Sequence, residues 1–99
     1  MEWIGFVKRE NVRKAEENLK KDFDLAAKQS ITIRDAKALD IDKNGSFFLI
    51  NGTEEGIKKC KELIKEITEE VDEKSLKKAK EKVKEEEDRA AEAFGGILG

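Results

Sequence analysis

Residues 46–64, SFFLINGTEEGIKKCKELI, carry the most regular strand and helix signals of the chain. Residues 46–50 form a short, almost entirely apolar run that predicts a buried strand, and Asn51 and Gly52 end it. Thr53 is a favourable helix N-cap, and the two acids after it suit the positive end of the helix dipole. The next apolar residues recur at spacings of three and four and predict one helix face: Ile57, Cys60, Ile64, Ile67 and Val71.

Toward the N-terminus, the apolar run at residues 2–8 predicts a short buried strand. A helical pattern opens at Glu10 or Asn11 and ends between Asp22 and Leu25. Its apolar face is predicted at Val12, Ala15, Leu19 and Phe23.

Between these regions, residues 31–33 alternate and are β-branched, which predicts a strand whose weaker continuation reaches Ile41. The sequence at residues 42–45, Asp-Lys-Asn-Gly, predicts a turn, so this strand and residues 46–50 are expected to form a β-hairpin. A last helix is expected from Asp72 or Ser75 to about Phe94, with residues 95–96, Gly-Gly, ending it.

The predicted fold class is α+β, a small two-layer domain of order β-α-β-β-α with an additional long C-terminal helix and with helices on one face of the sheet. Residues 1–71 are expected to form the globular body. Residues 72–99 are expected to form a charged helix and a Gly-rich apolar tail of the same domain.

Composition narrows the function classes more than any motif does. The 99 residues include no His, Tyr or Pro and one Cys, while 44% are charged, so the side chains most used in nucleophilic, metal and redox chemistry are scarce. We therefore expect no enzymatic activity, cofactor or metal site. The net charge of −2 gives no overall attraction to nucleic acid or anionic lipid, and the balanced Lys and Glu content is typical of heat-adapted surfaces.

The location and membrane relationship follow from the same features. The single Cys forms no internal disulfide, the first residues lack the pattern of a signal peptide, and the longest apolar run is far too short to cross a bilayer. We expect a cytoplasmic protein that makes no use of a membrane.

The C-terminal helix is the first candidate interaction surface. Leu76, Val83, Ala90 and Ile97 recur at intervals of seven, as in a thin coiled-coil seam, and Phe94 and Leu98 add apolar surface near the end. A Lys-rich segment, residues 74–84, precedes an acidic run, residues 85–88, against the preference of the helix dipole.

Two copies of this helix laid head to tail would pair these opposite charges. The sequence therefore suggests self-association, or docking of a protein partner with matching polarity. The alternative is that the helix packs against its own domain through Leu76, Ala79 and Val83.

A nucleic-acid surface is the second candidate. Its residues would be Lys8, Arg9, Arg13 and Lys14, with Trp3 and Phe6 as stacking groups. Interspersed acids argue against this surface, and Trp3 and Phe6 are equally explained as core residues.

Two further features have structural explanations. Residues 40–45, Asp-Ile-Asp-Lys-Asn-Gly, match the first half of an EF-hand loop, but the position of the bidentate Glu is Asn51, and a polar turn explains the segment. Cys60 lies on the predicted buried helix face and is expected to be an unreactive core thiol.

Residues 48–64, FLINGTEEGIKKCKELI, also carry a family resemblance. The strand, the Ile-x-Gly turn and the spaced Ile and Cys positions make residues 30–67 resemble the second half of a type I KH domain. The resemblance implies RNA or DNA binding, but KH domains clamp the nucleic-acid backbone with a GXXG loop, and residues 9–12 read Arg-Glu-Asn-Val at that place. A non-catalytic interaction or assembly module is thus the predicted function, and a degenerate KH-like module is the alternative.

Overall fold

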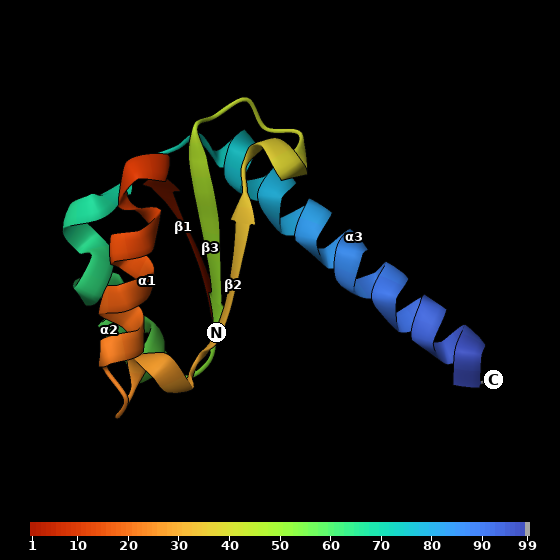
Figure 1. The fold of residues 1–99 in the computed structure, drawn as a ribbon, viewed down its shortest axis with the longest axis horizontal. Helices are drawn as coiled ribbons and strands as arrows, with labels where there is room; N and C mark the ends of the chain where they lie inside the picture. The colour runs from red at the N-terminus through yellow and green to blue at the C-terminus, as the bar shows by residue number, and fades with distance from the viewer. Residues whose placement is uncertain (99) are drawn as a thin grey trace.

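The structure is a computed structural model that describes residues 1–98, with side chains described through Arg89. A four-stranded antiparallel sheet of order β2-β3-β1-β4 lies at its centre (Figure 1). The strands are β1 (Glu2–Lys8), β2 (Ser30–Asp35), β3 (Gly45–Asn51) and β4 (Thr68–Glu69). The helices are α1 (Val12–Lys21), α2 (Glu54–Ile64) and α3 (Glu73–Leu98). Single 3-10 turns are η1 (Arg9–Asn11), η2 (Ala26–Lys28), η3 (Lys37–Leu39) and η4 (Lys65–Ile67).

The α+β class and the order β-α-β-β-α are confirmed, and a short fourth strand extends the order. Strand β4 pairs with the end of β1, at Phe6 and Val7, while β1 also pairs along its whole length with β3. A helix connects β1 to β2 and another connects β3 to β4. This is the split βαβ topology of ferredoxin-like domains.

The two faces of the sheet are both covered, because side chains alternate along its two central strands. On one face, Val7, Phe48 and Ile50 pack with the apolar stripes of α1 and α2. On the other face, Phe6 and Phe47 contact each other at 5.1 Å between ring centroids and pack under the start of α3. The expectation that the helices share one face holds for α1 and α2 and is wrong for α3, which forms a partial third layer (Figure 1).

Helix α2 begins as predicted and ends earlier than predicted. The Thr53 Oγ1 accepts a hydrogen bond from the Gly56 N–H at 3.0 Å, which is an N-cap. The helix stops at Ile64, although the apolar spacing continues to Val71. After Ile64 the chain turns through η4 into β4, where pairing of Thr68 and Glu69 with β1 satisfies backbone groups that a longer helix would have bonded internally. Ile67 and Val71 consequently pack in different cores.

Three other local expectations are wrong. Phe23 lies beyond the end of α1 and is 76% exposed, because α1 stops at Lys21. Strand β2 ends at Asp35, so the connection to β3 is a nine-residue loop containing η3 instead of a tight turn. Helix α3 runs on to Leu98, through the two glycines expected to end it.

The loop between β2 and β3 contributes side chains to the second core, which its sequence pattern did not indicate. Leu39 is fully buried and Ile41 is 6% exposed, so both join the second core beneath α3. Asp40 adopts a left-handed backbone conformation with φ of 59°, which Asp tolerates better than most residues. The loop therefore packs against α3 through the side chains of Leu39 and Ile41.

This packing predicts that α3 contributes to the stability of the whole domain. Val83 is 4% exposed, so Val83→Ala should lower the free energy of unfolding by about 1–3 kcal/mol through lost burial and a small cavity. The matched control, Glu81→Ala at an exposed residue of the same helix outside the α3 contacts, should change it by less than about 0.5 kcal/mol. Urea unfolding followed by circular dichroism measures both, and equal effects would contradict the packing of α3 on the sheet.

Candidate functional site

The first half of α3 is attached to the body by apolar and ionic contacts together. Ala79 is fully buried, Val83 is nearly so, and Leu76 packs at their margin. The lysines between them contact acceptors of the same domain: Lys78 Nζ donates to the Asp40 carbonyl at 2.6 Å and Lys82 lies 3.6 Å from the Asp40 carboxylate.

Two more ion pairs extend this attachment along α3. Lys80 Nζ lies 3.7 Å from a Glu2 carboxylate oxygen, and the Arg34 Nε donates to Glu86 at 3.0 Å. The three lysines come before Glu86 along α3, and all four residues have partners in the body of the domain, so the domain itself pairs the charge order that opposes the helix dipole. Each exposed pair stabilises by only about 0–1 kcal/mol, so the pairs orient a helix that the apolar contacts hold.

The predicted contact residues of α3 fall into two groups. Leu76 and Val83 face the second core, in the arrangement that the sequence left open as the alternative. Ala90, Phe94, Ile97 and Leu98 lie beyond the residues whose side chains are described. The helix backbone that carries them extends past the body of the domain (Figure 1).

A wedge-shaped pocket of about 290 Å³ opens where α3 diverges from the sheet. The sheet side supplies Leu49 and Thr32, and both are only partly buried. The helix side supplies Val83 together with Lys84 and Glu87, two exposed residues of opposite charge. The remaining lining residues are Glu2, Ser30, Asn51 and Lys80. The pocket therefore combines a small apolar floor with a rim of both charges.

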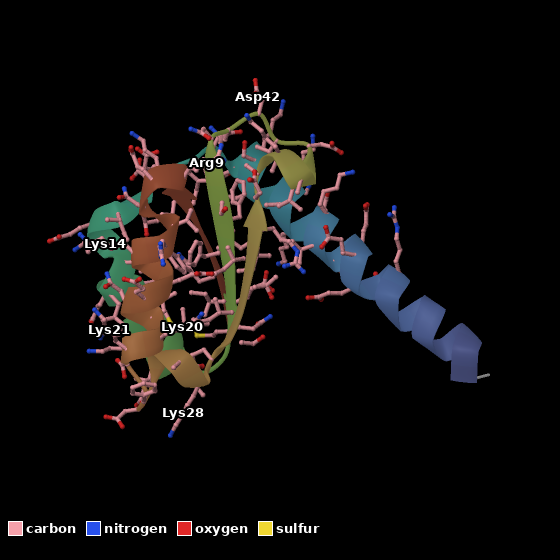
Figure 2. The ribbon with its side chains drawn as sticks, viewed as in Figure 1. Arg9, Lys14, Lys20, Lys21, Lys28 and Asp42 are labelled. Atoms are coloured by element: carbon pink, nitrogen blue, oxygen red, sulfur yellow. The ribbon has the colours of Figure 1, made fainter. Side chains whose placement is uncertain are left out.

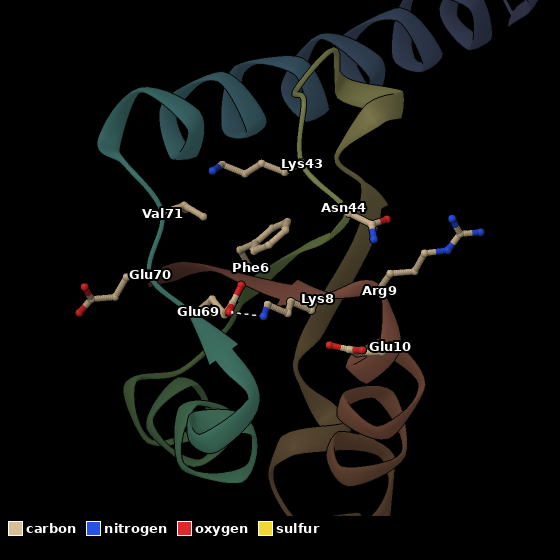
Figure 3. Close-up of a pocket in the computed structure, with 9 residues that line it drawn as sticks. All are labelled: Phe6, Lys8, Arg9, Glu10, Lys43, Asn44, Glu69, Glu70 and Val71. Atoms are coloured by element: carbon tan, nitrogen blue, oxygen red, sulfur yellow. Dashed lines mark ion pairs between the residues drawn. The ribbon is translucent and has the colours of Figure 1, made fainter.

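A larger cleft of about 640 Å³ lies at the end of β1 (Figure 3). Its lining residues are Phe6, Lys8, Arg9, Glu10, Lys43, Asn44, Glu69, Glu70 and Val71. Lys8 and Glu69 point toward each other and form an ion pair of 3.1 Å, whereas Arg9 points away from it (Figure 3). Among the described residues that line this cleft, no nucleophile lies beside a general base. The cleft is a surface on which basic and acidic side chains alternate with a small apolar area.

The four predicted nucleic-acid residues do not form one surface of free cations. Lys8 pairs with Glu69, and Arg13 lies 3.8 Å from Glu17 on the same helix. Arg9 lies at the start of η1 and Lys14 on the outer side of α1 (Figure 2). Trp3 and Phe6 both pack as core residues, on opposite faces of the sheet.

Cys60 and the half EF-hand segment, residues 40–45, both have roles in packing or in local ion pairing. Cys60 is fully buried in the first core, and burial, with a smaller contribution from the charge of Asp22, raises the pKa of its thiol. Asp40 is engaged by Lys78 and Lys82. Within the described residues there is no cluster of three potential metal ligands. None of the described helices is long and apolar enough to span a bilayer.

Comparison with known proteins adds no further assignment. No family model, no curated protein and no solved structure matches this chain. The resemblance of residues 30–67 to a KH domain therefore stays a prediction. Residues 9–11, at the place of the KH loop, form η1.

The surroundings of Cys60 predict a thiol that reacts only when the domain opens. At pH 8 the folded protein should react with iodoacetamide at least about 100-fold more slowly than the urea-unfolded chain, because the native thiol is buried and its pKa is raised. The raised pKa also means that the native state holds the thiol proton more tightly than the unfolded state. Stability should accordingly fall as pH rises above the ordinary thiol pKa. Equal alkylation rates in the folded and unfolded chain would contradict this assignment.

Proposed function

We propose that the chain is a non-catalytic assembly module that self-associates through α3. The observation that carries the proposal is the division of this 26-residue helix into a docked first half and a second half that extends past the body (Figure 1). Isolated helices shorter than about 12–15 residues are marginal in water, so a projecting half-helix gains stability from a partner. A module of this kind needs no cofactor.

In this proposal a second copy of α3 lies antiparallel beside the first, and some of its side chains enter the wedge between α3 and the sheet. Lys84 and Glu87 both line the wedge and are three residues apart, so an antiparallel partner brings each Lys84 beside the Glu87 of the other copy. Leu49, which is only partly buried, supplies apolar surface beneath these pairs. The seam predicted from sequence continues at Ala90, Phe94, Ile97 and Leu98 along the same helix. The resulting contact is twofold symmetric, as in most homodimers.

The proposal predicts a dimer whose stability depends on Glu87. Light scattering of the full chain should give twice the monomer mass of 11.2 kDa. Glu87→Lys should raise the dimer dissociation constant about fivefold to tenfold, because it converts two attractions into repulsions. The double variant Lys84→Glu with Glu87→Lys should restore association, because it exchanges the two charges.

The control is Glu81→Lys, an equal charge change on an exposed residue of α3 outside the wedge. It should leave the dissociation constant within about twofold of the original. A full chain that stays monomeric at all concentrations would refute self-association. A dimer weakened equally by Glu81→Lys and Glu87→Lys would place the contact elsewhere.

The alternative proposal is a degenerate KH-like module that binds RNA or DNA. Exposed basic residues on and after α1, including Lys14, Lys20, Lys21 and Lys28, support it (Figure 2). The pairing of Lys8 and Arg13 with acids weakens it. Single-stranded RNA at about 50 mM salt tests it, since electrostatic binding is strong there and declines as salt rises. We expect no binding, and a salt-dependent shift of α1 amides would favour the alternative.

A cytoplasmic location is part of the proposal. The single cysteine supports it, because small secreted domains rely on disulfides more often than cytoplasmic ones do.

A further inference from the structure

Part of strand β1 has a free edge within the described residues. Strand β4 pairs only with Phe6 and Val7, so residues 2–5 have no neighbouring strand on that side. Natural edge strands are usually protected by charges, proline or bulges. Here Trp3, Ile4 and Gly5 form an uncharged, regular segment that pairs normally with β3 on its other side.

The hydrogen bonds to β3 show which backbone groups face this free edge. The Gly52 N–H donates to the Met1 carbonyl at 3.0 Å, and the Arg9 N–H donates to the Asn44 carbonyl at 3.1 Å. In an antiparallel pair, alternate residues direct both backbone groups toward the same neighbour. Odd-numbered residues of β1 therefore bond to β3. The N–H and C=O groups of Glu2 and Ile4 face the free edge.

A groove of about 440 Å³ runs beside this edge, and its wall is mostly apolar. Trp3 supplies the aromatic surface, and the Lys61 Nζ lies 5.7 Å from the centroid of its ring. The ring lies over Gly5, where an added Cβ would be 2.5 Å from the Trp3 Cη2 atom. Only glycine at this position lets the indole lie along the strand beside the open backbone.

The charges of the groove indicate what can enter it. Lys58, Lys61 and Lys65 line the side formed by α2 and η4. Of the three acids in the lining, Glu69 is already paired with Lys8 at 3.1 Å. Three lysines thus face two acids that have no ion pair among the described residues, Glu62 and Glu70, and the groove favours an acidic ligand.

We propose that this edge binds an extended peptide segment of another protein, which adds to the sheet as a strand beside β1. Its backbone bonds to Glu2 and Ile4, an apolar side chain packs on Trp3, and an acidic side chain meets Lys61. About four residues of the peptide match the length of the free edge. The site shares Glu2 with the lining of the α3 wedge but uses only the backbone of that residue, so a variant that weakens the α3 contact is needed to separate the two tests.

Fluorescence tests the proposal directly, because Trp3 is the only Trp of a chain without Tyr. The probe is the capped peptide acetyl-Val-Thr-Glu-Thr-Val-Thr-amide, titrated into the full chain, because its Val and Glu side chains lie on the same face of an extended strand. We expect a saturable change in Trp3 emission. Bound peptide should also slow amide hydrogen exchange at Glu2 and Ile4, but not at Trp3, whose N–H already bonds to β3.

Two controls separate strand addition from other contacts. A peptide N-methylated on the edge that faces β1 should bind about tenfold more weakly, because it loses backbone donors. Lys61→Glu should weaken binding, whereas Lys77→Glu, an equal change on an exposed residue of α3, should not. The Glu87→Lys variant should bind the peptide normally whether or not the chain self-associates.

Three results would overturn the proposal. The first is no emission change up to about 1 mM peptide, which leaves no binding of useful strength. The second is equal binding of the N-methylated and unmethylated peptides, which excludes backbone pairing. The third is a change in Trp3 emission with protein concentration alone, which would make a second copy the occupant of the groove.

Discussion

The pairing of β1 with β3 is the constraint on which the rest of the structure depends. Both strands are central, and in each of them alternate residues face opposite sides of the sheet. Val7 and Phe48 face one core while Phe6 and Phe47 face the other. Large apolar residues on both faces of one sheet require two covering layers. The pair α1 and α2 covers the first face, and α3 with the loop after β2 covers the second.

The second layer is thinner than the first, and this difference shapes the candidate function. Helix α3 contributes small residues, Ala79 and Val83, and reaches the sheet only over part of its length. Its lysines contact Asp40 and Glu2 of the same domain, so most of the charge pattern orients the helix on its own body. Two charges that line the wedge, Lys84 and Glu87, have no ion pair among the described residues.

The first face presents the opposite situation, because its core is complete and its edge is open. The apolar stripes of α1 and α2 bury this face, yet β4 covers only two residues of β1. The early end of α2 and the turn through η4 leave the Trp3 groove beside an unpaired backbone. Most residues of the wedge and of this groove lie on different faces of the sheet, and Glu2 lies at the boundary between them.

The sequence by itself determined the elements whose signals are local. The apolar run at residues 46–50 and the Thr53 cap defined β3 and the start of α2, and the spacing of Ala15 and Leu19 defined the buried side of α1. The buried position of Cys60 followed from the same helical spacing. These features depend on neighbours within a few residues, which periodicity and capping report directly.

Only the tertiary structure decided those features in which contacts between distant segments outweighed the local spacing of apolar residues. The apolar spacing of α2 continues to Val71, but pairing with β1 drew residues 68–69 into a strand. The stripe of Leu76 and Val83 would look the same in the sequence whether it packed on a second copy or on the sheet. In the structure it packs on the sheet, because the second face of the sheet carries large apolar side chains that need a covering layer. The free edge of β1 was equally hidden, because an unpaired backbone depends on how far a neighbouring strand extends. Contacts between distant segments set these outcomes, and no local spacing records them.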